Sequence, residues 1–272
     1  MIASTSASTT KMLLSGWERA LLVLPALAGL LLGFFLVFLP GRFAAITQFP
    51  ADDAYIYQLA GATILGYGVA LSFSLFQQYW LAVRLVVIGV LVNNLASLYA
   101  CVIAIFTGNA PYSVYLFLAT NLLFVAICCL LLARHWGVPH PEADFATPFM
   151  RVLLIVGTVA AGAFGVLPLF VPDLFTLFHL HINAPFIIRE AGAGSLGYAV
   201  VAVLAQRTLN SQELRLITVM AAVFNGVGGL VSIPYLLAGN ILLLPWVIAP
   251  VGLVVLVACL LVIRQTMVRK TS

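Results

Sequence analysis

Charged side chains are scarce in this sequence. Only 7% of its 272 residues are Asp, Glu, Lys or Arg, whereas 64% are hydrophobic, and the mean hydropathy is +1.17. A soluble globular domain carries about 25% charged residues, so this chain has too few charges to cover a water-facing surface of its size. The shortage excludes the soluble classes and predicts an integral membrane protein, whose first partner is the lipid bilayer.

Neither the basic residues nor the cysteines indicate a polar partner. The twelve Lys and Arg residues form no basic stripe, so we expect no binding of nucleic acid. The thiols lie in apolar stretches, without CxxC spacing and without a histidine at ligand spacing, so we expect buried thiols and no metal. They are Cys101, Cys128, Cys129 and Cys259.

Motifs of known catalytic chemistry are also missing. The sequence contains no phosphate-binding loop, no nucleophile elbow and no HExxH zinc motif. Its four histidines do not fall at matching depths on two helices, as a pair of haem ligands would. We therefore expect no cofactor, and we lean against an enzyme.

Long apolar runs are what the sequence does contain. A helix needs about 20 residues to cross a hydrocarbon core of about 30 Å, and eight runs are long enough. Helices are expected because backbone polar groups in lipid must be bonded within their own segment. The predicted spans are residues 18–39, 54–76, 80–106, 113–134, 149–171, 185–206, 213–237 and 244–265.

The positions of the basic residues predict the orientation. With eight spans, all of the Lys and Arg residues except Arg42 and Arg189 fall on the side that carries both termini. Positive charge collects on the cytoplasmic side of a membrane. We therefore predict a multi-pass protein of the cytoplasmic (inner) membrane, with a disordered cytoplasmic N-terminus at residues 1–17 and a cytoplasmic tail at residues 266–272.

One phrase of small residues occurs twice. Residues 60–70 read AGATILGYGVA, and residues 191–201, which lie 131 positions later, read AGAGSLGYAVV. When the sequence is aligned with itself at this offset, Arg84 aligns with Arg215 and Gly108 aligns with Gly239. Matching polar residues at one constant offset indicate an internal duplication.

The duplication predicts two parallel halves. Each half contains four spans, an even number, so both enter and leave the membrane on the same face. The predicted fold class is an all-α membrane protein of eight transmembrane helices, built as two parallel four-helix repeats. These repeats are residues 18–135 and 149–265, joined by a cytoplasmic linker at residues 136–148.

The repeated phrase has two interpretations. Helices in lipid associate through close backbone approach, which small residues permit, and Ala62, Gly66 and Ala70 recur every four residues. This spacing favours a helix-packing stripe. Alternatively, the small residues leave room for a ligand or lipid beside Tyr67 and Tyr198.

Three asparagines are predicted to lie near the middle of the membrane. Asn94 lies ten residues after Arg84 and Asn225 ten after Arg215, a distance of about 15 Å along a helix, and Asn121 falls at similar depth. Amides are costly when they face lipid, so we expect them to point into the bundle. Interhelical hydrogen bonds or a polar site between the halves would both satisfy them.

Polar residues also mark the other ends of the second and sixth spans. Gln58 occupies the position equivalent to Arg189, which is followed by Glu190. They either reach toward the interface, as long polar side chains do, or form a charged vestibule for a ligand. The loops at residues 40–53 and 171–185 mix aromatic and polar residues, and we expect short interfacial helices there.

The repeated phrase carries one resemblance. LAGATILGYGVA, after a first span that ends in FLP, resembles small uncharacterised bacterial four-helix membrane proteins of the DoxX-like kind, here in tandem. The resemblance implies a topology, but no activity and no functional residues.

Two functions are consistent with these patterns. The shortage of ionisable residues within the spans favours a structural or accessory subunit, packed with itself as a homo-oligomer or with other membrane subunits. The alternative is a transporter or binder of a small, weakly polar or lipid-like molecule between the two repeats. The candidate site residues are Gln58, Tyr67, Asn94, Asn121, Arg189, Glu190, Tyr198 and Asn225.

Overall fold

The structure is a computed structural model. It describes residues 13–49, 53–108, 110–138, 147–183, 185–208, 211–239 and 241–268. Most of the predicted N-terminal segment, most of the linker at residues 136–148 and the last residues of the tail lie outside these ranges. Within the N-terminal segment, Leu13 forms an isolated bridge with Tyr79, and the first described helix begins at Gly16.

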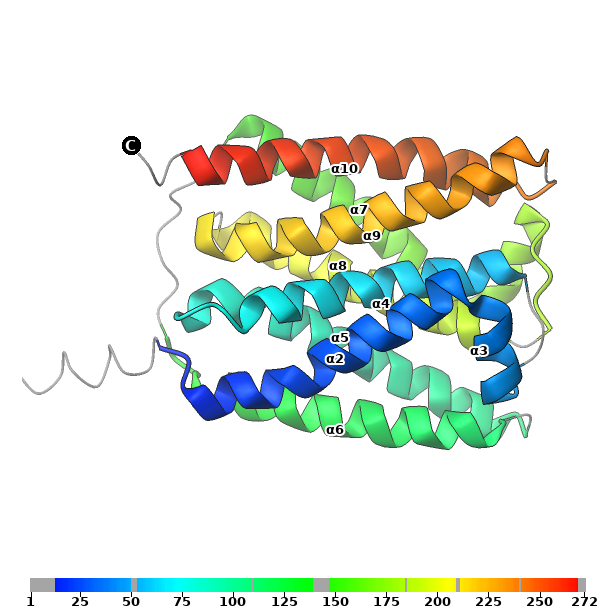
Figure 1. Cartoon of the computed structure of the whole chain (residues 1–272), viewed down its shortest axis with the longest axis horizontal. Helices are drawn as coiled ribbons and strands as arrows, with labels where there is room; N and C mark the ends of the chain where they lie inside the picture. Colours follow the sequence, from blue (N-terminus) through cyan, green and yellow to red (C-terminus); the bar gives the residue numbers. More distant parts are fainter. Residues whose placement is uncertain are drawn as a thin grey trace, which may run out of the picture.

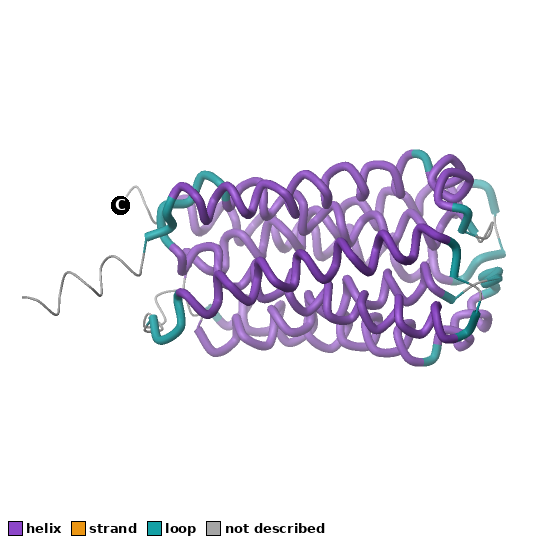
Figure 2. The backbone as a smooth tube through the Cα atoms, turned by 90° about the horizontal axis from the view of Figure 1, so that it is seen from below, coloured by secondary structure: helices purple, strands orange, loops and turns teal. Residues whose placement is uncertain are grey.

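Eight long helices account for most of the described residues (Figures 1 and 2). All eight are long and apolar enough to cross a membrane, which confirms the predicted all-α, multi-pass architecture. They are α2 (Gly16–Phe38), α4 (Ala54–Ser74), α5 (Trp80–Phe106), α6 (Tyr112–Arg134), α7 (Pro148–Phe170), α8 (Phe186–Thr208), α9 (Ser211–Leu237) and α10 (Leu244–Val268).

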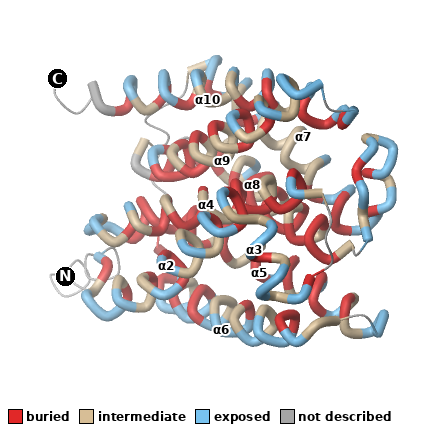
Figure 3. Tube along the Cα trace, turned by 45° about the vertical axis from the view of Figure 1, so that its right-hand side comes forward, coloured by how far each residue is buried: buried red, intermediate tan, exposed pale blue. Residues whose placement is uncertain are grey.

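Four of these helices form the centre of the bundle and the other four surround it. Helices α4 and α9 pack together, as do α5 and α8, while α2, α6, α7 and α10 pack on α4, α5, α8 and α9 respectively. In α4 and α8, 61% of the residues of the 18-residue apolar stretch are buried, against 22% in α6, α7 and α10 (Figure 3). The outer helices therefore present most of the surface that lipid would cover.

Two short helices lie at the end of the bundle opposite to the start of α2 and the end of α10 (Figure 1). They are α3 (Pro40–Thr47) and the 3-10 helix η1 (Pro172–Phe178), and they confirm the predicted short helices. Each ends in a residue of left-handed conformation, Gln48 with φ 59° and His179 with φ 62°. We call this end the distal end and the opposite one the terminal end.

Buried charged groups join helices at the terminal end. The carboxylate of Glu18 accepts a hydrogen bond from the Ser15 backbone amide and lies 2.9 Å from both Arg134 Nε and His135 Nε2, so it ties α2 to α6. The imidazole of His135 stacks on Trp80 of α5. Arg84 of α5 and Glu213 of α9 form a second buried ion pair, which joins the two halves of the chain.

Candidate ligand-binding site

Two tyrosines form reciprocal hydrogen bonds at the centre of the bundle. Tyr67 of α4 donates to the carbonyl oxygen of Gly194 at 2.8 Å, and Tyr198 of α8 donates to that of Thr63 at 3.1 Å. The two rings lie 4.8 Å apart, and both side chains are buried. The two donors, Tyr67 and Tyr198, are 131 positions apart in the sequence. The two acceptors, Thr63 and Gly194, are separated by the same number.

The small residues of the repeated phrase give these tyrosines their space. A Cβ atom added at Gly66 would overlap the phenolic oxygen of Tyr198, and one added at Gly197 would overlap that of Tyr67. The stripe therefore works as close helix packing, with no separate space for a ligand between Gly66 and Tyr198.

Removing either hydroxyl tests this central contact. We expect Tyr67→Phe and Tyr198→Phe each to destabilise the protein by about 1 kcal/mol, since each removes a buried hydroxyl donor. Tyr198→Phe also removes a longer bond, of 3.4 Å, to the carbonyl oxygen of Met220. Because the two bonds are reciprocal, the effects should be similar. The measurement is thermal unfolding in detergent, followed by the reaction of the buried Cys101, Cys128 and Cys259 thiols with a fluorescent dye. Effects differing severalfold would contradict the equivalence of the two bonds.

A cavity of about 450 Å³ lies beside this pair, and residues of the first half of the chain line it together with Glu190 of α8. We call it the first cavity. Its wall on α2 is apolar, whereas α5 and α6 contribute amides and hydroxyls, and α8 contributes one carboxylate. Its polar lining residues are Thr47, Tyr67, Asn93, Asn94, Ser97, Thr120, Asn121 and Glu190.

The first cavity opens on the outer face of the bundle. Leu31 of α2 and Leu116 of α6 both line it, and they are 62% and 64% exposed. Ile46 of α3 lines the same opening and is also exposed. These apolar residues lie on the lipid-facing surface, so the opening leads into the bilayer between α2 and α6.

Glu190 is the charged residue of this lining. The residue is only 7% exposed, and its Oε2 accepts a hydrogen bond from Ser97 Oγ of α5 at 2.7 Å. Oε1 is buried and has no hydrogen-bond partner in the described part of the chain. The prediction that Glu190 reaches toward the interface is therefore wrong, because α5 packs over this side of α8.

The neighbouring polar residues take other directions. Arg189 Nε donates to the carbonyl oxygen of Leu169 of α7 at 3.3 Å, away from Ser97. Gln58 donates to the carbonyl oxygen of Val37 at 3.1 Å and accepts from the Tyr235 hydroxyl at 3.0 Å, linking α2, α4 and α9. The predicted vestibule residues therefore do not gather at one place.

The asparagines divide between two cavities. Asn94 and Asn121 line the first cavity, whereas Asn225 lines a second one. The amides of Asn94 and Asn225 donate to carbonyl oxygens four residues earlier in their own helices, Val90 and Ala221, at 2.7 and 2.8 Å. The expectation of interhelical hydrogen bonds is therefore wrong for these two amide donors.

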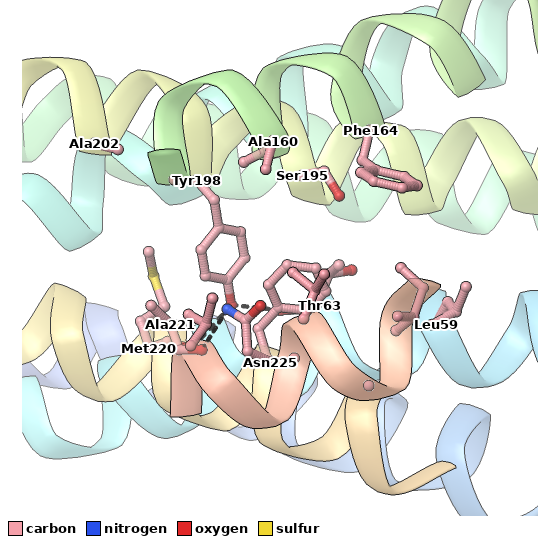
Figure 4. A pocket seen from close by; sticks show the side chains of 18 of the residues that line it. Leu59, Thr63, Ala160, Phe164, Ser195, Tyr198, Ala202, Met220, Ala221 and Asn225 are labelled. Carbon is pink, nitrogen blue, oxygen red and sulfur yellow. Dashed lines mark hydrogen bonds between the residues drawn. The ribbon is translucent and has the colours of Figure 1, made fainter. Parts of the chain in front are cut away.

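The second cavity has a volume of about 210 Å³ and lies among α4, α7, α8, α9 and α10 (Figure 4). Figure 4 shows Tyr198, Ser195 and Asn225 around it, together with apolar side chains such as Phe164. Leu59 lines it at the position equivalent to Glu190. This cavity contains no charged lining residue in the described part of the chain.

Sequence reasoning missed part of the polar wall. Asn93 and Ser97 lie four residues apart, and Asn94 and Ser97 three apart, so all three fall on one side of α5. That spacing is the signal that could have identified Ser97. The contact between Ser97 and Glu190 depends on how α5 packs against α8, and no spacing within one helix reveals it.

Comparison of the chain with protein-family models, with curated proteins and with solved structures finds no match. The resemblance to DoxX-like proteins therefore rests only on the residues quoted above.

Proposed function

We propose that the protein binds a small, partly polar molecule within the bilayer, in the first cavity. The observation that carries this proposal is the buried Glu190 Oε1, which has no protein partner among the described residues and belongs to a cavity lined by three asparagines. A buried polar group without a partner costs about 1–3 kcal/mol. A ligand that enters from the lipid and bonds to this group would remove that cost.

The proposal includes the duplication, with parallel repeats at residues 18–135 and 149–265. Three independent features at the offset of 131 support it: the reciprocal tyrosine bonds, the left-handed residues Gln48 and His179, and the cavities. More than half of the residues lining the first cavity have equivalents lining the second. The two cavities are thus the same site in two copies.

Differences between the copies indicate which residues serve function. At five pairs of equivalent positions the first cavity has a polar residue where the second has an apolar residue or glycine, whereas Ile64 and Ser195 differ in the opposite sense. The five pairs are Asn93 and Phe224, Ser97 and Gly228, Thr120 and Val251, Asn121 and Gly252, and Glu190 and Leu59. Since the helices around the second cavity pack without these polar groups, the fold does not require them, and a ligand gives them a purpose.

This proposal replaces the structural or accessory subunit as the favoured function. A subunit that serves only to pack with others has no use for an uncompensated carboxylate at an open cavity, which costs stability. The first cavity opens to lipid, so the occupant is amphipathic and reaches the site laterally. With both termini in the cytoplasm, as the basic residues predict, the distal end and Glu190 belong to the outer half of the membrane.

The substitution Asn93→Phe tests the proposal. It places in the first cavity the aromatic side chain that Phe224 already supplies in the second, so we expect the fold to tolerate it. The protein is purified in nanodiscs formed from its native membrane, and the small molecules that it retains are identified by mass spectrometry. We expect one molecule enriched at about one per chain in the wild type and reduced at least about tenfold in Asn93→Phe.

A matched control is Leu95→Phe, which introduces the same aromatic side chain on the same helix at an exposed position that lines neither cavity. It should retain most of the bound molecule. The proposal would be abandoned if Asn93→Phe and the wild type, equally stable on heating, carried the same molecules in the same amounts.

A further inference from the structure

The carboxylate of Glu190 faces only neutral groups. Ser97 bonds one oxygen, and the amides of Asn93, Asn94 and Asn121 line the same cavity. Among the described residues, the ion pairs involve Glu18 and Glu213 but not Glu190. Its sequence neighbour Arg189 bonds to α7 instead. A positive charge that pairs with an ionised Glu190 would therefore come from outside these groups.

We infer that the first cavity takes an amphipathic amine, whose protonated nitrogen pairs with Glu190 Oε1 and whose apolar body lies between α2 and α6. The inference rests on the proposed function and names the class of its ligand. An ammonium group placed there would donate charge-assisted hydrogen bonds to the carboxylate, which are stronger than bonds between neutral groups. Tyr67, Phe117 and Phe124 also line the cavity, and aromatic rings attract cations.

The shape and access of the cavity favour an organic cation over a metal ion. A bare divalent ion needs several oxygen ligands at close range and arrives from water. The first cavity instead opens between apolar, lipid-facing residues such as Leu31 and Leu116, and its volume of about 450 Å³ is far larger than an ion requires. An anionic ligand would be repelled by the carboxylate.

The second cavity supplies an internal comparison. Leu59 lies against Gly228 there, since a Cβ added at Gly228 would sit 4.0 Å from Leu59 Cδ2, just as Glu190 lies against Ser97 in the first. Two helices thus meet in the same way with a leucine and a glycine. The Glu190–Ser97 pair is therefore an addition to this contact and not a condition for it.

Two probe molecules of similar shape, an amine and an alcohol, test the inference at pH 7. Phenylbutylamine carries a positive charge at pH 7, as alkylamines do, and phenylbutanol does not. Binding of each to washed wild-type protein is measured by isothermal titration calorimetry. We expect the amine to bind at least about tenfold more tightly than the alcohol, the discrimination that one charge-assisted hydrogen bond supplies. Glu190→Gln should remove this preference and leave alcohol binding unchanged.

Asp53→Asn is the matched control, because Asp53 is a distal carboxylate that bonds to the His181 amide and does not line the cavity. It should keep the amine preference. Equal binding of both probes to the wild type, with both lost in Asn93→Phe, overturns the amine inference and leaves the proposed function standing. If neither probe binds and Asn93→Phe retains the wild-type molecules, both fall. If neither binds but Asn93→Phe loses its molecule, only the amine inference falls.

Discussion

The substitution Gly66→Ala is expected to destabilise the protein by about 3 kcal/mol or more. Its Cβ would overlap the Tyr198 hydroxyl and would lie 2.9 Å from the carbonyl oxygen of Met220, which belongs to the backbone of α9 and cannot turn aside. Overpacking a closely packed contact costs about 1–3 kcal/mol, and displacing Tyr198 also breaks its bond to Thr63, worth about 1 kcal/mol. Thermal unfolding in detergent measures the loss.

Gly162→Ala is the control for this effect. A Cβ at Gly162 would meet nothing closer than the Ala199 Cβ at 4.0 Å, and alanine favours a helix over glycine by about 1 kcal/mol. Stability should be unchanged or higher. Combining Gly66→Ala with Tyr198→Phe should recover part of the loss, because the overlapping oxygen is then absent. If Gly66→Ala were as stable as Gly162→Ala, the central packing described here would be wrong.

The substitution Glu213→Leu is the second change with a large expected effect. It leaves the guanidinium of Arg84, whose side chain is only 10% exposed, without its carboxylate partner between α5 and α9. Breaking a buried ion pair by removing one partner costs about 3–5 kcal/mol, because the remaining charge stays buried. We expect a large fall in the unfolding temperature and loss of protein from the membrane fraction.

Two further variants separate the ion pair from a general loss of charge. Arg215→Leu removes a charge at the equivalent position of the second half, where the side chain is exposed, and it should change stability by less than about 1 kcal/mol. The double variant Arg84→Met with Glu213→Leu should be more stable than Glu213→Leu alone, since no uncompensated charge remains. A double variant as unstable as the single one would show that the loss does not come from the orphaned arginine.

The transmembrane helices were readable from the sequence, and so were the short distal ones. A run of about 20 apolar residues indicates a transmembrane helix. In the loops after the first and fifth spans, the apolar residues recur at the spacing of a helix. These predictions depend on each segment by itself.

The site was only partly readable, because it depends on how the helices are rotated against each other. Arg84 and Glu190 were both interpreted as residues near an interface, since they lie close to the ends of predicted spans. In the structure α9 covers Arg84 and α5 covers Glu190, so both are buried. The volume of the first cavity is set by side chains from several helices at once, and no single segment encodes it.

The central claim is that the first cavity holds a small molecule bonded to Glu190. It is tested most directly by an experimental structure of the protein in nanodiscs made from its native membrane, compared with that of Glu190→Leu. We predict non-protein density between α2 and α6, within hydrogen-bonding distance of Glu190 Oε1, that is absent from the variant. A first cavity closed by side chains, or filled by a hydrocarbon chain that touches no polar group and persists in Glu190→Leu, would contradict the claim.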